Sequence, residues 1–235
     1  MNNHIPTRRH VLALGGATAI TAVAGCVNSS GSQPLGGADD EGNDDTSNSG
    51  DDHNHDHDHE LGHPEASIEV SMESDEDTHH FVPHVVHIEE GGAVTWYLES
   101  GAHDTVAYHP DNSNLLPSST ERRIPEDTHP WASDLYRTEG ETFERTFEES
   151  GVYDYGCTVV EHGHGPDRGR GHHGHHRTHE ETGMVGRVIV GWPEYDEDTE
   201  PALRAPQADL PDRARREFDS FNERTEEALR HGGHR

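Results

Sequence analysis

Short runs of alternating apolar and polar residues dominate the middle of the chain, between residues 67 and 191. Such alternation is typical of β-strands that bury one face. Turn-forming residues, including glycines, separate the runs, and the stretch 110–139 predicts a long connection. The pattern predicts strands at residues 67–72, 81–88, 93–99, 104–109, 141–148, 152–157 and 184–191. Short strands at this density in about 125 residues indicate an all-β, two-sheet sandwich.

The hydrophobic spacing changes in the tail, residues 192–235. Apolar residues recur every three or four positions between Leu210 and Ala228, Pro211 suits a first helical turn, and Gly232 suits a stop. This predicts one amphipathic helix at about residues 209–230. We expect the helix to pack on the sandwich, with partner binding as the alternative.

The N-terminal residues 1–26 have the pattern of an export signal. Arg8 and Arg9 precede an apolar run of 14 residues from Val11 to Ala24, shorter than the ~20 that a membrane-spanning helix needs. The arginine pair resembles a twin-arginine signal, and the "VAGC" that ends at Cys26 resembles a lipobox. We expect export and anchoring by a lipid on Cys26 at the outer face of the cytoplasmic membrane; the alternative is a cleaved signal that takes Cys26 with it.

Residues 27–66 are rich in Gly, Ser, Asn and Asp and predict a disordered, acidic and histidine-rich linker. Histidines and aspartates alternate within residues 52–59. This alternation fits either weak binding of zinc, nickel or copper or a solvated spacer.

The composition is strongly acidic. The chain has 47 acidic residues against 17 basic residues, and every basic residue is an arginine. Only 29% of its residues are hydrophobic. Such a balance is typical of disorder or of a folded domain adapted to very high salt, where carboxylate repulsion is screened. The strand pattern favours a folded, halophilic protein, and the lack of a basic patch argues against a nucleic-acid partner.

The candidate chemistry lies at strand ends. Cys157 ends one predicted strand, His179 and Met184 open the next, and His103 lies beside an earlier one. If Cys26 is lipidated or removed, Cys157 is a lone exported thiol, which calls for a chemical role. A thiolate, two imidazoles and a thioether are the ligand set of a blue-copper electron-transfer site.

Three stretches carry a family resemblance: "GAHDTVAY", "EGETFERTFEESGVYDYGC" and "HEETGMVGRVIVG". Residues 67–191 thereby resemble the plastocyanin and halocyanin branch of the cupredoxins, in the form of a haloarchaeal exported lipoprotein. The resemblance implies a Greek-key β-sandwich with one type 1 copper. By matching motif it implies His103, Cys157 and Met184 as ligands.

The second imidazole departs from the family pattern of cysteine, two residues, histidine, four residues and methionine. His179 has four residues before Met184, but 21 residues separate it from Cys157. The alternative is His162, which four residues separate from Cys157, as in azurin, although Pro166 stands where the methionine of azurin would fall. We favour His179, which makes residues 158–178 a histidine-rich insertion. Its histidines fit either extra zinc, copper or nickel sites or a solvated loop.

These features favour a membrane-tethered carrier of single electrons between a redox donor and acceptor, themselves membrane complexes. We expect no small-molecule substrate and no enzyme activity, because no nucleophile triad, phosphate loop or carboxylate pair is evident. A copper nitrite reductase would need a second cupredoxin domain. The alternative from another class is a copper or zinc buffer or chaperone that uses the histidine-rich segments.

Overall fold

The computed structural model describes residues 61–75, 78–162 and 176–232. The predicted signal, its Cys26, the linker as far as residue 60 and the histidine-rich loop 163–175 lie outside the described residues. Within the described part, no helix combines the length and the apolar character needed to cross a membrane.

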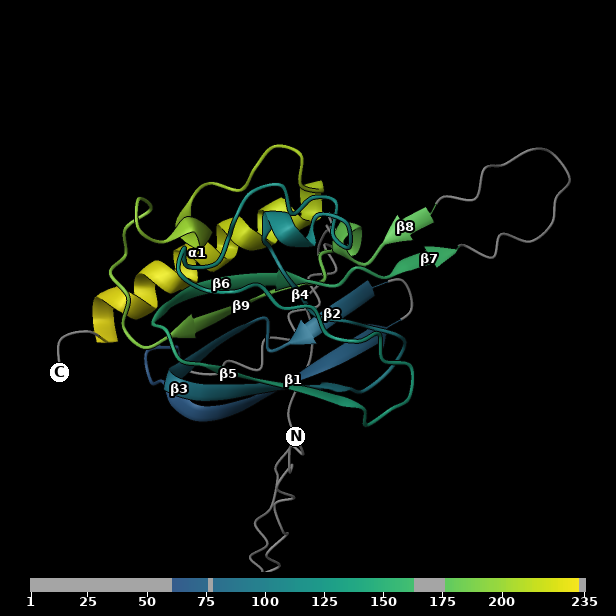
Figure 1. The fold of residues 1–235 in the computed structure, drawn as a ribbon, viewed down its shortest axis with the longest axis horizontal. Helices are drawn as coiled ribbons and strands as arrows, with labels where there is room; N and C mark the ends of the chain where they lie inside the picture. The colour runs from purple at the N-terminus through teal and green to yellow at the C-terminus, as the bar shows by residue number, and fades with distance from the viewer. Residues whose placement is uncertain (1–60, 76–77, 163–175, 233–235) are drawn as a thin grey trace, which may run out of the picture. The chain divides into compact units, whose positions relative to one another are not determined.

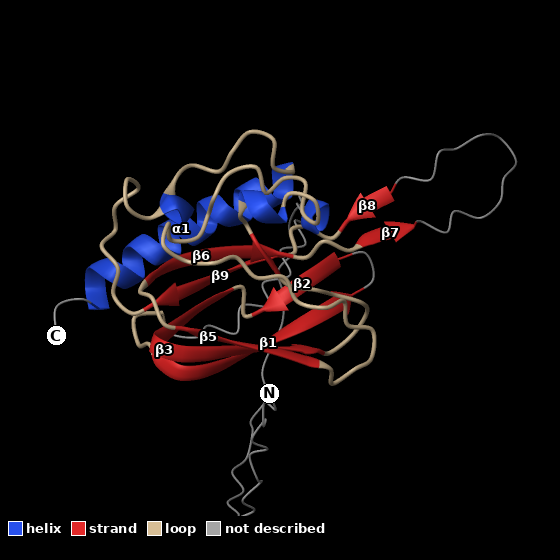
Figure 2. Cartoon of the chain, in the orientation of Figure 1, coloured by secondary structure: helices blue, strands red, loops and turns tan. Residues whose placement is uncertain are grey.

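The chain folds into strands with short 3-10 turns and one C-terminal helix (Figures 1 and 2). The strands are β1 (Glu65–Asp75), β2 (Thr78–Val82), β3 (Val85–Leu98), β4 (Val106–Ala107), β5 (Thr142–Phe147), β6 (Gly151–Gly156), β7 (Val160–His162), β8 (His176–Thr178) and β9 (Val185–Val190). The 3-10 turns are η1 (Pro110–Asn112), η2 (Glu180–Thr182) and η3 (Pro201–Leu203), and the helix is α1 (Asp212–Gly232).

Strand β3 joins the two layers of the sandwich. Its first part, Val85–Ile88, pairs in parallel with β9, whereas its later part pairs with β1 on one side and β5 on the other. The sequence predicted two strands here, separated by a turn at Gly91 and Gly92. The structure instead has one continuous strand. Gly91 has a φ of 77°, and a Cβ on Gly92 would lie 2.8 Å from the carbonyl oxygen of Glu89, so the glycines bend the strand without ending it.

The space between the two layers is filled by alternate side chains of the strands. In β3 the residues Val94, Trp96 and Leu98 are buried, whereas the residues between them are partly exposed, as expected for a strand with one inward face. Tyr153 and Tyr155 of β6 enter the same core. The two-layer sandwich predicted from the strand pattern is confirmed.

Helix α1 covers the outer face of the layer formed by β6 and β9 (Figure 2). Phe218 and Phe221 are buried against Val185 and Ile189, and burial of each phenylalanine is worth about 1.5–3 kcal/mol. The predicted helix and its packing on the sandwich are confirmed, with bounds shifted by two or three residues toward the C-terminus.

A buried ionic cluster links the same layer to the tail. Asp154 of β6 accepts hydrogen bonds from Arg123 at 2.9 Å and from Arg187 at 2.7 Å, and all three side chains are buried. Both arginines also donate to the carbonyl oxygen of Ala202, and Arg187 donates to Thr225 of α1. Because every charge has a partner, the cluster can be buried and fixes where the tail docks.

One predicted boundary changes, and the ends of the insertion are ordered. Strand β1 begins at Glu65, so residues 65 and 66, expected in the linker, belong to the sandwich. Leu61 also packs against the cluster beneath α1. The two ends of the predicted insertion form an antiparallel hairpin, β7–β8, that projects from the sandwich (Figure 1). Ladder hydrogen bonds, rather than apolar packing, hold these ends together.

Candidate metal centre

Cys157 lies at the end of β6, directly opposite Met184. The antiparallel pairing of β6 with β9 ends at Gly156 and Val185, and the amide of Cys157 continues it by donating to the carbonyl oxygen of Met184 at 3.1 Å. Both side chains are fully buried, and Cys157 is a free cysteine. The sheet register therefore places thiol and thioether residues side by side at one end of the sandwich.

His103 is held at the same end by an isolated bridge to Tyr136, with hydrogen bonds in both directions between the two backbones. The next residue, Asp104, accepts hydrogen bonds from the backbone amide and the hydroxyl of Thr158. Because Thr158 follows Cys157, this carboxylate ties the loop of His103 to the loop of Cys157.

A tight turn joins His179 to Met184. The carbonyl oxygen of His179 accepts hydrogen bonds from the amides of Thr182 and Met184 and from the Thr182 hydroxyl. Gly183 ends the turn in the left-handed region, with a φ of 90°, where other residues are strained. The four-residue spacing thus closes a compact loop that brings His179 back over the strand end.

Three donor atoms meet in this loop cluster. The Nδ1 atoms of His103 and His179 are 3.1 Å apart, and the sulfur of Cys157 lies 3.7 Å from the first and 3.4 Å from the second. A metal bonded to three such donors at about 2.0–2.3 Å in one plane separates them by roughly 3.5–3.8 Å. The thiol and the two imidazoles therefore lie close to the spacing that one small metal ion needs, and binding would move the two Nδ1 atoms a few tenths of an ångström apart.

The protonation states of the donors follow from their burial. Burial, aided by the neighbouring His79, lowers the pKa of His103 to about 4 and that of His179 to about 3. Burial also raises the pKa of the Cys157 thiol well above its ordinary value, and Asp104 adds to the rise. The imidazoles are therefore neutral and ready to bind at neutral pH, whereas a metal must displace the proton of the thiol.

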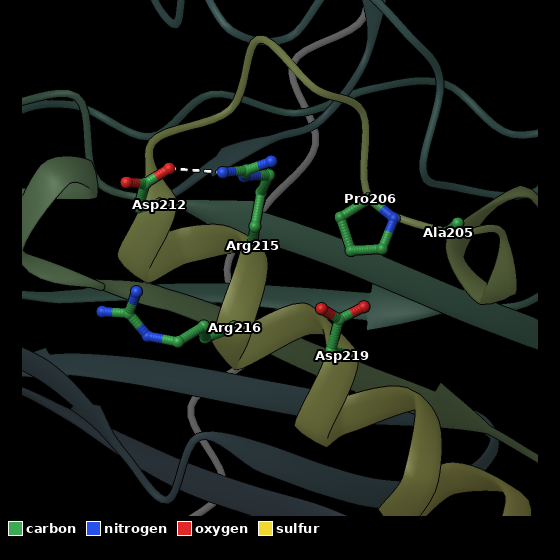
Figure 3. Close-up of a pocket in the computed structure, with 6 residues that line it drawn as sticks. All are labelled: Ala205, Pro206, Asp212, Arg215, Arg216 and Asp219. Carbon is green, nitrogen blue, oxygen red and sulfur yellow. Dashed lines mark hydrogen bonds and ion pairs between the residues drawn. The ribbon is translucent and has the colours of Figure 1, made fainter.

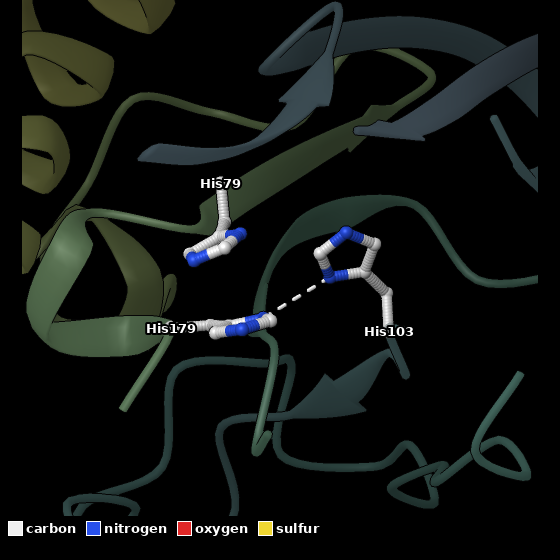
Figure 4. Close-up of side chains that lie close together, drawn as sticks. All are labelled: His79, His103 and His179. Carbon is white, nitrogen blue, oxygen red and sulfur yellow. Dashed lines mark hydrogen bonds between the residues drawn. The ribbon is translucent and has the colours of Figure 1, made fainter. Parts of the chain in front are cut away.

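A third imidazole, not expected from the sequence, completes the cluster. His79 of β2 is buried, and one ring nitrogen from each of His79, His103 and His179 lies within 4.8 Å of the others (Figure 4). The oxygen Oγ of Ser74 contacts both His79 Nδ1, at 2.9 Å, and His103 Nε2, at 3.0 Å. A weak signal for His79 exists in the sequence, because it lies two residues before the core residue Phe81 and so shares its face of the strand.

Other histidines, including the alternative candidate His162, lie outside the donor cluster. His162 pairs with His176 at the outer end of the β7–β8 hairpin, whereas His179 contacts Cys157. His109 accepts a hydrogen bond from the amide of Asp111 and so begins η1. His87 is buried and bonds the carbonyl oxygen of Gly191. The side chains of His109 and His87 therefore stabilise the local structure around them.

A separate surface pocket lies at the start of α1 (Figure 3). It is lined by Ala205, Pro206, Asp212, Arg215, Arg216 and Asp219. Arg215 pairs with Asp212, and the lining carries equal numbers of arginines and aspartates. It contains no sulfur or imidazole donor and shares no residue with the cluster around Cys157, so it does not bear on the metal centre.

The sequence of the domain matches a known family model. Residues 68–165 match copper binding proteins of the plastocyanin/azurin family. The domain is a cupredoxin-like β-sandwich. The match includes His103 and Cys157 and ends before His179 and Met184. Together with the histidine cluster, it supports the cupredoxin family and copper as the metal.

Solved structures with a similar fold include pseudoazurin from Methylobacterium extorquens AM1, at 17% identity and a TM-score of 0.41, over 67% of this chain and 98% of that chain. A purple cupredoxin from Nitrosopumilus maritimus has 21% identity and a TM-score of 0.33, over 53% and 99%. The copper-containing nitrite reductase from Thermus scotoductus SA-01 has 19% identity and a TM-score of 0.34, over 54% of this chain and 23% of that chain. No curated protein matches the chain.

Proposed function

We propose that the protein carries single electrons between redox proteins by means of one type 1 copper bound to His103, Cys157, His179 and Met184. The observation that carries this proposal is the meeting of the Cys157 sulfur with the two Nδ1 atoms at one end of the sandwich. Neutral imidazoles and a thiol that ionises on metal binding suit copper in both oxidation states. Copper held there would exchange one electron at a time.

The protein contributes rigidity and exclusion of water. His103 is fixed by the bridge to Tyr136, and His179 by the turn that ends at Gly183. All four proposed ligands are buried. Ligands that do not move when the charge changes keep the reorganisation energy of electron transfer low, which is what a carrier requires. The chain makes and breaks no substrate bonds in this role, so it is not an enzyme.

The setting of the carrier is part of the proposal. The resemblance of residues 1–26 to a twin-arginine signal with a lipobox supports export and a lipid anchor on Cys26. The acidic, glycine-rich linker would then hold the sandwich near membrane redox complexes at the outer face of the membrane. The strongly acidic composition and the halocyanin-like motifs support a haloarchaeal carrier.

The first experiment replaces the thiolate. Copper bound to wild-type protein should give an intense visible thiolate-to-copper absorption band, and Cys157→Ser should lose this band completely, because serine offers no sulfur donor. The matched control is Ser150→Cys in the same background, which restores a thiol outside the donor cluster and should not restore the colour. A fully coloured Cys157→Ser protein would refute the site.

The second histidine is tested by cavity variants. In His179→Gly the site should open, so that added imidazole restores a spectrum lost in its absence, whereas His162→Gly should keep the wild-type spectrum. The reverse result would assign the ligand to His162. Metal counting on the same samples distinguishes a carrier, with one tightly held coloured copper, from a buffer that holds several colourless ions on its histidine-rich segments.

A further inference from the structure

The ring of His79 lies face to face on the ring of His179. Their centroids are 3.6 Å apart and their planes differ by 14°, and Figure 4 shows His79 over the face of His179, whereas the dashed contact to His103 leaves the edge of the His179 ring. His79 meets His103 differently, edge on, at 5.7 Å and 61°. The stacked pair is therefore specific to His79 and the proposed second imidazole ligand.

The stack also shows that His79 does not bind the same ion as His179. The lone pair of an imidazole nitrogen lies in the plane of its ring, so two parallel rings separated by 3.6 Å do not aim their nitrogens at one ion. His103 and His179, whose planes differ by 56°, do converge through their Nδ1 atoms. His79 is therefore a neighbour of the metal site rather than a further ligand to the same ion.

Glu161 of the β7–β8 hairpin closes the outer side of this pair. Its Oε1 atom lies 3.4 Å from Nε2 of His79 and 3.8 Å from Nε2 of His179. The glutamate side chain is half-exposed at 52%, whereas the two histidines are 1% and 2% exposed. The insertion thus places one carboxylate at the surface over the edges of both rings.

We infer that His79 is a positioning residue of the copper site: stacked on His179, it fixes the plane of that ring and, with Glu161, closes the site against external ligands. The inference rests on the proposed function. Ser74 links His79 to the first proposed imidazole ligand, because its Oγ atom contacts both His79 Nδ1 and His103 Nε2. Residues next to a metal site commonly orient its imidazole ligands by contacting the part of the ring that does not bind the metal.

The stack itself is tested without metal. In the nuclear magnetic resonance spectrum of the reduced, metal-free protein, the ring current of His79 should shift the ring protons of His179 to high field. His79→Phe should keep the shift because it keeps an aromatic face, whereas His79→Ala and His79→Leu should lose it. The control is His84→Ala, which removes a histidine ring that stacks on His80 instead. Unchanged His179 signals in both His79→Ala and His79→Leu would overturn the inference.

The closure is tested with copper bound and sodium azide as the external ligand. Azide should leave the visible spectra of wild type, His79→Phe and His84→Ala unchanged, and should produce a saturable spectral change in His79→Ala. If His79→Ala does not fold, Glu161→Ala is measured instead, since its half-exposed side chain is dispensable for packing, and it should admit azide. If azide changes the visible spectrum of no folded variant, the closure of the site by His79 and Glu161 is refuted. A wild-type protein with no thiolate band would refute the proposed function, whereas the metal-free shifts would still report the stack.

Discussion

Glu200 is a buried carboxyl group beside the start of β6, whereas the candidate site lies beyond the other end of that strand. Its Oε2 atom accepts a hydrogen bond from the amide of Val152 at 3.0 Å. Burial raises the pKa of Glu200 from 4.5 to about 7, and the hydrogen bond only partly offsets the rise. The folded state therefore binds this proton more tightly than the unfolded state does. The stability that this group contributes is fully present below its ordinary pKa and is lost as the pH rises toward 7.

We predict that Glu200→Gln gains stability relative to wild type as the pH rises from about 4.5 to about 7, with no further gain above that range. The amide oxygen of glutamine can still accept the bond from Val152, so the hydrogen bond is retained. Midpoints of urea unfolding at constant salt measure the difference. The exposed Glu126→Gln controls for the loss of one negative charge, and a pH-independent difference for Glu200→Gln would contradict the prediction.

Single residues show what sequence reasoning can reach at this end of the sandwich. Cys157, His179 and Met184 were predicted as a group from strand ends, and the structure places Cys157 and His179 in contact with His103, with Met184 opposite Cys157. His79 was missed because its neighbours His80 and Thr78 make the segment look polar. Its burial depends on the register that pairs Glu73 with His80 and Ser74 with His79, and nothing local in the sequence specifies that register.

The turn that carries His179 and Met184 is a single element braced by α1. A Cβ on Gly183 would lie 2.9 Å from the side chain of Arg213, the second residue of the helix. The turn is also anchored by Glu180, which accepts hydrogen bonds from Tyr108 and Ser118. The C-terminal helix therefore supports the metal site through this turn as well as covering the sheet.

We predict that Gly183→Ala lowers the free energy of unfolding by more than the ~1–2 kcal/mol that a left-handed backbone costs a residue with a Cβ, because the new methyl group also meets Arg213. It should also shift the visible spectrum of the copper-loaded protein. The matched control is Gly140→Ala, where φ is 84° and no atom lies within 4 Å of the new Cβ. Chemical denaturation measures the free energy of unfolding of the two variants. Equal losses in the two variants would show that Arg213 does not press on the turn.

At the scale of elements, the sequence could predict the features that local residue patterns determine, but not those that depend on contacts between distant segments. Alternation and turn residues are local, so most sandwich strands and α1 were predicted near their observed places. The strand predicted at residues 81–88 is wrong, because the chain bends at Pro83 between the end of β2 and the start of β3. The continuity of β3 was missed because Gly91 and Gly92 signal a turn equally well in a hairpin and in a bend. The β7–β8 hairpin was missed because it is held by backbone hydrogen bonds between polar residues, and the hydrophobic pattern carries no record of these.

At the scale of the whole molecule, a strongly acidic chain forms a packed interior in the part that the structure describes. Its apolar residues fill a core between the layers and a second one beneath α1. The formal net charge of the chain is −30 at pH 7. Self-repulsion at this charge favours expanded states, and it acts over the whole surface rather than at one pair.

The charge predicts how stability depends on salt. The screening length falls from about 10 Å at 0.1 M salt to about 3 Å at 1 M, so repulsion among surface carboxylates should fade and the melting temperature of the metal-free protein should rise over this range. The combined replacement of Glu121, Glu139, Glu148 and Glu223, all exposed, by glutamine reduces the repulsion directly and should flatten the rise. Thermal unfolding followed by circular dichroism in sodium and potassium chloride measures both. Because screening depends on ionic strength, the two salts should act alike; a rise equally steep in the quadruple variant would assign the salt effect to apolar burial instead of charge.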